Sequence, residues 1–359
     1  MNDEIQTLFQ ADQADWQVDR LLPPDVMEKD RERRETMDVL GCPVTDDLLA
    51  QWARHIVSPV APFFLAEVDR PLVPIGAILF ERAEIAADHS DLPLEARDAY
   101  ALYRIVPEAT WATLLTDTLL DDLAPAARRA LLRAQWRLGR GQIYDHATAR
   151  DLCGSSVSAR AALGAWTFDT DEGEKVALQH RAWWTFPEDV RRRWLCWFVA
   201  QGRDACVAGS LTEGQWATID SRYRAVVRHL AGRFLLRSGP NCFSTTLAAL
   251  APDSVHADAI ARLWLHQAPF LRALETQGFR KISPIECAAE YPPGTVLLWQ
   301  DGAGMAQHAC FVAGPGWALN KDDQGWFVPR QLVPLQHVVE SWRDDYLTIL
   351  PYQSNGSSG

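Results

Sequence analysis

The chain has 359 residues, of which 48% are hydrophobic and 23% are charged, the composition of a globular protein. This length predicts about two domains, each large enough for a core of its own. The formal net charge of −12 at pH 7 disfavours a nucleic acid as the main partner, because nucleic-acid-binding proteins carry an excess of Lys and Arg.

The N-terminus and the cysteines indicate where the protein works. Residues 1–6 contain two acids, and no basic or apolar segment of signal-peptide length follows them. The most apolar stretch, residues 71–80, contains two prolines and is far shorter than the roughly 20 residues of a membrane-spanning helix. The seven cysteines are odd in number and lack Cys-x-x-Cys spacing, which fits a reducing compartment. We therefore expect a cytoplasmic protein without membrane contact.

The first part of the chain is expected to hold a polar arm and an accessory domain. Residues 1–40 are dense in charge and form the predicted arm, and residues 41–235 form a mainly helical domain rich in tryptophan. Periodic apolar residues predict one helix between Pro125 and Gly139 and another from Pro187 to Gly202. This domain is expected to shape the substrate cleft or to bind a protein partner.

Two further segments of the accessory domain have distinct patterns. Residues 165–178 place polar turn residues between two β-prone runs, which predicts a hairpin. Apolar residues recur at helical spacing from Thr212 to Phe234, which predicts one helix of more than five turns. Because this helix runs almost directly into the next domain, we expect it to pack against that domain.

Residues 236–353 are predicted to form an α+β domain in which a helix lies against an antiparallel sheet. Helical patterns occur at residues 256–277, which Pro269 should kink or split, and in a capping-box pattern at residues 283–286. Residues 354–359 are expected to be a disordered tail. The predicted strands are residues 296–300, 307–312, 317–321, 327–329 and 346–350, with a short helix at residues 337–342.

Cys242 is the most informative residue of this domain. It follows the turn at residues 238–241 and opens a predicted helix. The unpaired N–H groups and the positive dipole end of a helix start favour a thiolate over a thiol, as a nucleophilic cysteine requires. A cysteine at a helix start is, however, more often a small buried hydrophobe, so the residues that accompany it decide between the two roles.

Two polar residues follow on predicted strands. His308 lies on residues 307–312 and Asn320 on residues 317–321. If adjacent strands place them on one face, Asn320 can accept a hydrogen bond from one ring nitrogen of His308 while the other ring nitrogen faces Cys242. Asp322 shares the parity of Asn320 and is the rival for the orienting role.

These motifs resemble those of NlpC-type papain-like cysteine peptidases and amidases, over the last third of the chain only. The resemblance rests on four short segments, residues 241–244, 291–299, 307–309 and 318–320. It implies that Cys242 is the nucleophile, His308 the general base and Asn320 the residue that orients the imidazole. Asn241 and the backbone N–H of Cys242 are candidates for stabilising the oxyanion.

The function expected from this pattern is a thiol-dependent amidase or peptidase that cleaves an amide or isopeptide bond. The resemblance implies peptides derived from the cell wall as one substrate class. Two alternatives stay open, an acyltransferase that uses the same Cys–His pair and a non-enzymatic binding or adaptor protein with a degenerate papain-like domain. No phosphate loop, dinucleotide fingerprint, Gly-x-Ser-x-Gly elbow or metal-ligand spacing is present, so we expect neither a cofactor nor a metal.

Overall fold

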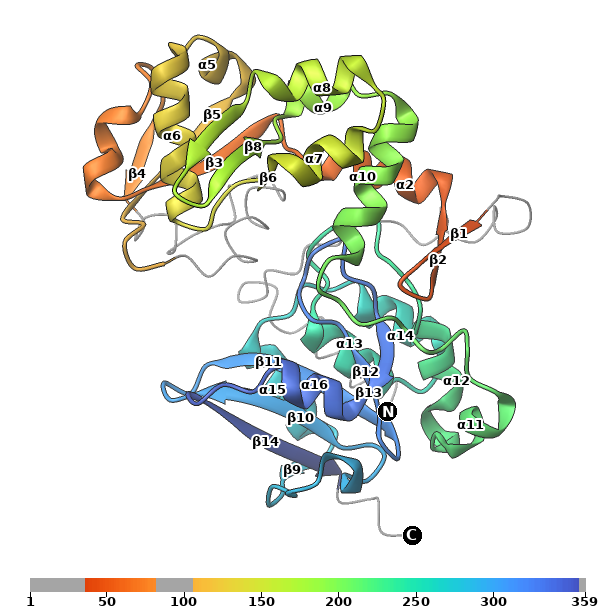
Figure 1. Cartoon of the computed structure of the whole chain (residues 1–359). Coiled ribbons are helices and arrows are strands. Elements are labelled where there is room, and N and C mark those ends of the chain that lie inside the picture. The colour runs from red at the N-terminus through yellow and green to blue at the C-terminus, as the bar shows by residue number, and fades with distance from the viewer. Residues whose placement is uncertain (1–35, 82–105, 355–359) are drawn as a thin grey trace. The chain divides into compact units, whose positions relative to one another are not determined.

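The computed structural model describes residues 36–81 and 106–354, and the chain separates into two compact units (Figure 1). Of the described residues, the first unit comprises residues 47–201, and the second unit joins residues 36–46 with residues 202–354. The division near residue 201 differs from the expected boundary at residue 235, because residues 202–235 pack with the C-terminal sheet. Residues 1–35 and 355–359, most of the expected arm and tail, lie outside the described residues.

The unit of residues 47–201 combines helices with two three-stranded antiparallel sheets. Its sheets have the orders β3-β5-β4 and β6-β8-β7. The strands are β3 (Val60–Leu65), β4 (Leu79–Glu81), β5 (Trp111–Thr116), β6 (Ile143–Asp145), β7 (Thr167–Thr170) and β8 (Gly173–Ala177). The helices are α2 (Asp46–His55), η2 (Glu67–Leu72), α5 (Asp117–Asp121), α6 (Pro125–Arg137), α7 (His146–Cys153), α8 (Val157–Gly164), α9 (His180–Trp184) and α10 (Glu188–Ala200).

The predictions for this unit are confirmed in part. Helices α6 and α10 and the β7–β8 hairpin form where expected, and α6 lies against β3 (Figure 1). The β3–β5–β4 sheet was not predicted. Its pairs join residues far apart in sequence, and Pro62 lies inside β3. A proline is tolerated there because β3 is an edge strand of its sheet.

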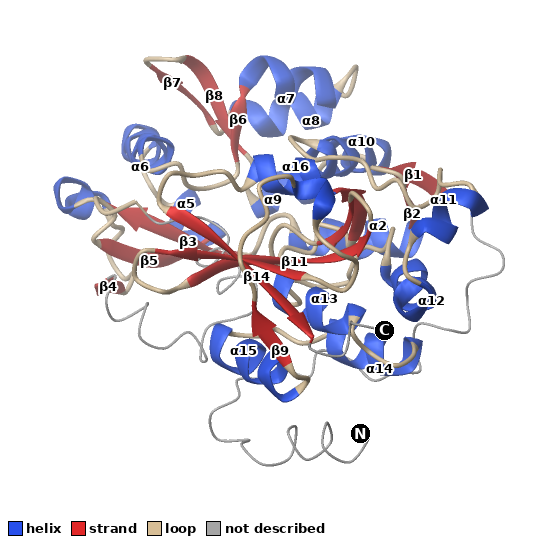
Figure 2. Cartoon of the chain, turned by 90° about the horizontal axis from the view of Figure 1, so that it is seen from below, coloured by secondary structure: helices blue, strands red, loops and turns tan. Residues whose placement is uncertain are grey.

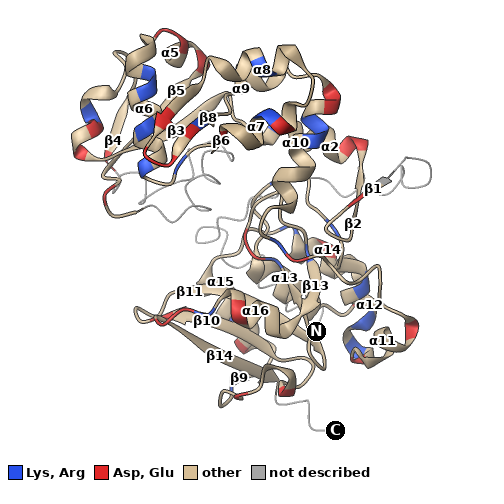
Figure 3. Cartoon of the chain, in the orientation of Figure 1, with Lys and Arg blue, Asp and Glu red and all other residues tan. Residues whose placement is uncertain are grey.

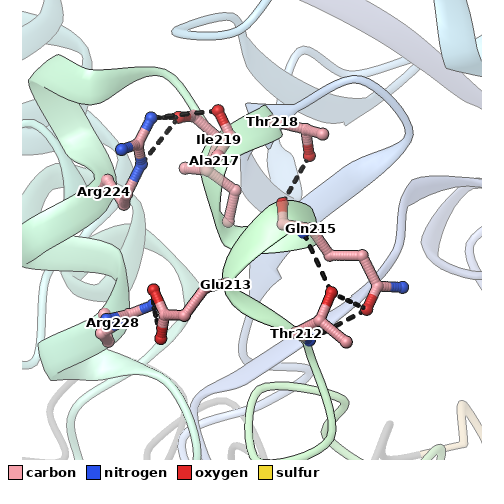
Figure 4. A network of polar contacts seen from close by, with 8 residues as sticks. All are labelled: Thr212, Glu213, Gln215, Ala217, Thr218, Ile219, Arg224 and Arg228. Atoms are coloured by element: carbon pink, nitrogen blue, oxygen red, sulfur yellow. Dashed lines mark hydrogen bonds and ion pairs between the residues drawn. The ribbon is translucent and has the colours of Figure 1, made fainter.

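The expected long helix from Thr212 to Phe234 is two helices, α11 (Glu213–Thr218) and α12 (Ser221–Leu230). The break falls at Ile219 and Asp220, where the Asp220 side chain accepts from the Arg222 N–H and caps α12. Figure 4 shows how Arg224 holds this break by donating to the carbonyls of Ala217 and Ile219. Apolar spacing alone does not reveal such an interruption, because the period continues across it.

Helix α12 packs against the C-terminal elements, as predicted. Its Tyr223 ring meets Phe311 edge to face, with centroids 4.9 Å apart, and α12 also contacts α13 (Cys242–Ala249) and α14 (Ser254–Ala261). The helical segment predicted at residues 256–277 is split, as expected, into α14 and α15 (Gln267–Thr276). The break precedes Pro269, which lies in the first turn of α15, where a missing N–H costs no helical hydrogen bond.

A six-stranded antiparallel sheet has the order β13-β12-β11-β10-β14-β9. Helix α13 contacts β11 and β12, and α15 contacts β9 (Figure 2). The chain is therefore of the α+β class. The strands are β9 (Phe279–Lys281), β10 (Val296–Asp301), β11 (Ala306–Gly314), β12 (Trp317–Asn320), β13 (Gln331–Pro334) and β14 (Leu347–Ser354), and the helical turns between them are η3 (Ala288–Glu290) and α16 (Leu335–Ser341).

Three details of this sheet differ from the prediction. Residues 327–329 are not a strand, and the edge strand β13 begins at Gln331. Residues 283–286 form no helix, and the turn η3 follows them instead. Strand β9 was missed because three residues carry too little pattern to stand out in a sequence.

One face of the sheet is packed with apolar side chains. Leu297, Trp299, Cys310, Val312 and Ala318 lie on this face together with residues of β13 and α16. Because residues alternate along a strand, His308 shares this face with Cys310 and Val312.

An N-terminal β-hairpin belongs to the second unit, together with the residues from Gly202 onward. Its strands are β1 (Thr36–Val39) and β2 (Cys42–Thr45), linked by Leu40 and Gly41, both of which have positive φ. A Cβ at Gly41 would lie 2.2 Å from the Cys206 carbonyl oxygen, so only glycine fits this close approach. Within the ranges that the structure describes, no helix is long and apolar enough to cross a membrane.

Candidate active site

Cys242 is the first residue of α13, as predicted. Asn241 is the N-cap, and its Oδ1 accepts from the Ser244 N–H at 3.2 Å while the Ser244 hydroxyl accepts from the Asn241 N–H at 3.0 Å. The Nδ2 of Asn241 donates to the Leu265 carbonyl at 2.6 Å. Asn241 therefore caps the helix and ties it to the segment before α15, and these bonds give no support to its expected role in stabilising an oxyanion.

The turn before Cys242 is held by the loop that follows β12. Gly239 has a φ of 123° and donates its N–H to the Gln324 carbonyl at 2.9 Å, and the Ser238 hydroxyl accepts from the Trp326 N–H at 3.1 Å. The start of α13 is thus connected to the same loop that carries Asp322. Sequence reasoning did not identify this connection, because its partners are more than 80 residues apart.

The thiol of Cys242 is buried, with 6% of the residue exposed. Burial raises the pKa of Cys242 to about 12, although N–H groups of Ala309 and Phe243 and the charge of Lys321 act to lower it. The expectation that the helix start makes this residue a thiolate is therefore wrong for this structure. Burial destabilises the thiolate by removing it from water, and this effect is larger than the stabilisation of the thiolate by the N–H groups at the helix N-terminus. The effect of the Ala309 N–H on this pKa nevertheless indicates that the sulfur lies near the residue that follows His308.

His308 and Asn320 are brought together as predicted. The Nε2 of His308 lies 2.9 Å from Oδ1 of Asn320, and Nδ2 of Asn320 donates to Oδ1 of Asp322 at 2.7 Å. The Asp322 carboxylate can only accept, so it fixes the Asn320 amide with its oxygen toward the ring. Nε2 then carries the proton in the neutral ring, which leaves the lone pair on Nδ1. Asn320 contacts the imidazole directly, and Asp322 positions Asn320.

Aromatic rings enclose His308, which has no exposed surface. The Trp342 ring stacks on it with centroids 4.2 Å apart and planes 5° apart, and Trp299 packs at 5.3 Å. Burial lowers the pKa of His308 to about 4, against the opposing effects of Asp322 and Asn320. The imidazole is therefore neutral at physiological pH.

The thiol and the imidazole do not form a hydrogen bond with each other. Nδ1 of His308 is buried and has no hydrogen-bond partner. The structure thus assembles His308, Asn320 and Asp322 into one chain of hydrogen bonds, with Cys242 next to it through Ala309. Catalytic hydrogen bonds are often long in the absence of substrate and shorten when it binds.

Two residues of the site were not predicted. Trp342 was assigned only to a short helix, although it covers His308 as the C-cap of α16. Lys321 is fully buried, and its Nζ donates to the carbonyls of Asp323 at 2.6 Å and Gly325 at 2.9 Å. Lys321 directly follows Asn320 at the end of an apolar strand. This position of a charged residue is the sequence signal that could have identified Lys321 as part of the site. Among the described residues, no group of three or more His, Cys, Asp or Glu side chains is arranged to hold a metal ion.

Comparisons of the chain with protein-family models, with curated proteins and with solved structures found no match. Functional assignment therefore rests on the residues and geometry of this chain.

Proposed function

We propose that this protein is a thiol-dependent amidase or peptidase with a papain-like domain, in which Cys242, His308 and Asn320 act together. The observation that carries the proposal is the 2.9 Å contact between His308 Nε2 and Asn320 Oδ1, which leaves Nδ1 free to accept a proton. The position of Cys242 at the start of α13, with its sulfur against the Ala309 N–H, supports the same assignment.

In the proposed reaction, His308 Nδ1 takes the Cys242 thiol proton as the sulfur attacks the carbonyl carbon. A C–S bond forms, and the carbonyl electron pair moves to the oxygen, where the backbone N–H of Cys242 would stabilise it. The C–N bond then breaks, and the amine leaves with the proton from His308. Water attacks the thioester, returns a proton through His308 and releases the acid, which restores the thiol.

Cys242 and His308 are both neutral before the reaction, so they differ from a cysteine–histidine pair that is already a thiolate and an imidazolium. The pKa of Cys242 is raised to about 12 and that of His308 is lowered to about 4, so the proton transfer accompanies the attack. Substrate binding would have to bring sulfur and Nδ1 into hydrogen-bond distance.

The same burial favours a second candidate, a binding protein with a degenerate papain-like domain. Cys242 and His308 are almost fully enclosed and share no hydrogen bond, as expected if the cysteine serves only in packing. The two candidates differ in whether Cys242 is required for turnover.

The test is hydrolysis of a panel of peptides with α-, γ- and D-residue amide bonds, followed by mass spectrometry of the released amines. The proposal expects cleavage of at least one member and its loss in Cys242→Ala and His308→Ala. Cys287→Ala is the matched control, because Cys287 is an exposed cysteine that should leave cleavage unchanged. Cleavage that persists in Cys242→Ala would overturn the mechanism, and the absence of any cleavage would favour the binding protein.

A further inference from the structure

Arg330 occupies an unusual position in the second unit. It precedes β13, and its backbone bridges to Arg233, with the Arg330 N–H donating to the Arg233 carbonyl at 2.9 Å. The Gly232 N–H donates to the Arg330 carbonyl at 2.8 Å. These bonds fix the backbone of Arg330 beside the segment that follows α12.

Two nitrogens of the Arg330 guanidinium are buried without hydrogen-bond partners. The residue is 5% exposed, and its Nε and Nη1 make no hydrogen bond. A guanidinium carries a permanent charge and five N–H donors, so burying it unpaired is costly. Native proteins normally satisfy such groups with a counter-charge, water or a ligand.

The neighbouring charges leave an excess of positive charge around Arg330. Burial lowers the pKa of Arg330 to about 10; the Asp258 carboxylate opposes this shift, and the charges of Arg233 and Arg262 add to it. Asp258 is already engaged, because its Oδ1 lies 2.9 Å from His229 Nε2. Among the described residues, the charged groups that act on Arg330 are thus two guanidinium groups and one carboxylate.

The remaining members of this group come from two helices that pack together. Arg233 follows α12, and its guanidinium lies 3.2 and 3.4 Å from the ring nitrogens of His229 on α12. Arg262 is the C-cap of α14, one turn after Asp258 on the same helix. Helices α12 and α14 are in contact, so the group is assembled by tertiary structure rather than by one segment.

The arginines of the neighbouring helix α12, in contrast to Arg330, have hydrogen-bond or ion-pair partners. Figure 3 shows the basic residues of α12, and all three of its arginines have partners. Arg222 pairs with Asp220 at 2.7 Å and Arg228 with Glu213 at 2.9 Å, while Arg224 donates to backbone carbonyls (Figure 4).

We propose that Arg330, Arg233 and Arg262 form a binding site for a small oxyanion, a phosphate or carboxylate group. Guanidinium groups match the planar oxygen pairs of such anions, and a bound anion would supply both the missing acceptors and the missing negative charge. The site contains none of the residues assigned to the thiol reaction, so it stands or falls separately from the proposed function.

The experiment is isothermal titration of the full chain with inorganic phosphate and, separately, with acetate, both at constant ionic strength. We expect saturable binding of at least one of them, and the stronger ligand identifies the preferred anion. Arg330→Met and Arg262→Gln should each weaken binding by about tenfold or more, because each removes a charge-assisted contact. Asp258→Asn should tighten binding, because it removes the competing carboxylate.

Arg343→Gln is the matched control, since Arg343 is an exposed arginine of the same unit, and it should bind as the wild type does. If Arg330→Met does not fold, Arg262→Gln tests the same site from a less buried position. The proposal is overturned if the wild type binds neither anion saturably. Equal affinity in wild type and Arg262→Gln would overturn it as well.

Discussion

Asn320 holds His308 through a single hydrogen bond, from the imidazole Nε2 to the amide Oδ1 at 2.9 Å, and both residues are buried. Asp322 sets the orientation of that amide from the other side. The arrangement therefore determines which ring nitrogen of His308 is protonated before any substrate is present, and several measurable consequences depend on it.

Replacing Asn320 with Ala should destabilise the protein by about 1–3 kcal/mol, because the buried Nε2–H of His308 loses its acceptor. Urea unfolding monitored by tryptophan fluorescence measures the change. Gln307→Ala, on the strand that carries His308, is the matched control, since the partly buried bond of Gln307 to Asp301 should contribute less. An equal decrease in the free energy of unfolding for the two variants would show that the His308–Asn320 hydrogen bond stabilises the protein no more than the Gln307–Asp301 hydrogen bond.

The pH dependence of stability should report the buried imidazole. The pKa of His308 is about 4 in the folded protein and ordinarily 6.5, so between these values the unfolded state binds a proton that the folded state does not. Stability contributed by this residue is therefore present above pH 6.5 and falls as the pH drops toward 4, by up to about 3 kcal/mol.

Unfolding of wild type and His308→Gln between pH 4 and pH 8 isolates this contribution from that of the carboxylates. The difference between the two proteins should change with pH over this range. His337→Gln, a change at an exposed histidine, should keep the wild-type profile. A His308→Gln profile parallel to that of the wild type would contradict the lowered pKa.

Alkylation should distinguish Cys242 from an exposed cysteine of the same chain. Because burial raises the pKa of Cys242 to about 12, little thiolate is present at pH 8, and iodoacetamide should modify Cys287 first. Peptide mass spectrometry of the folded protein over time measures both rates. In urea the two rates should converge. Rapid modification of Cys242 in the folded state would instead indicate an activated thiolate.

Gly294 ends the Pro-Pro-Gly segment before β10 and should tolerate no side chain. Its φ is 88°, and a Cβ would lie 2.9 Å from the Tyr223 hydroxyl oxygen. Gly294→Ala should therefore destabilise the protein by about 1–3 kcal/mol through backbone strain and displacement of Tyr223. Gly302→Ala is the control, because a Cβ there meets no atom within 4 Å. Thermal unfolding of the two variants gives the comparison, and an unchanged transition for Gly294→Ala would contradict it.

Local patterns in the sequence were enough to predict the elements that carry the candidate site. The turn before Cys242, the helix that it opens and the strands of His308 and Asn320 all depend on neighbouring residues: caps, turn formers and alternating apolar side chains. Strand parity also placed His308 and Asn320 within reach of each other, which the 2.9 Å contact confirms.

Tertiary structure alone decided the properties that depend on burial and on distant partners. The pKa of Cys242 follows from its enclosure, not from its position at a helix start, and the stacking of Trp342 on His308 joins residues 34 positions apart. The division of the units near residue 201 and the group around Arg330 likewise arise from contacts between separate segments. A sequence records the period and caps of each element, whereas desolvation and packing are set only when those elements meet.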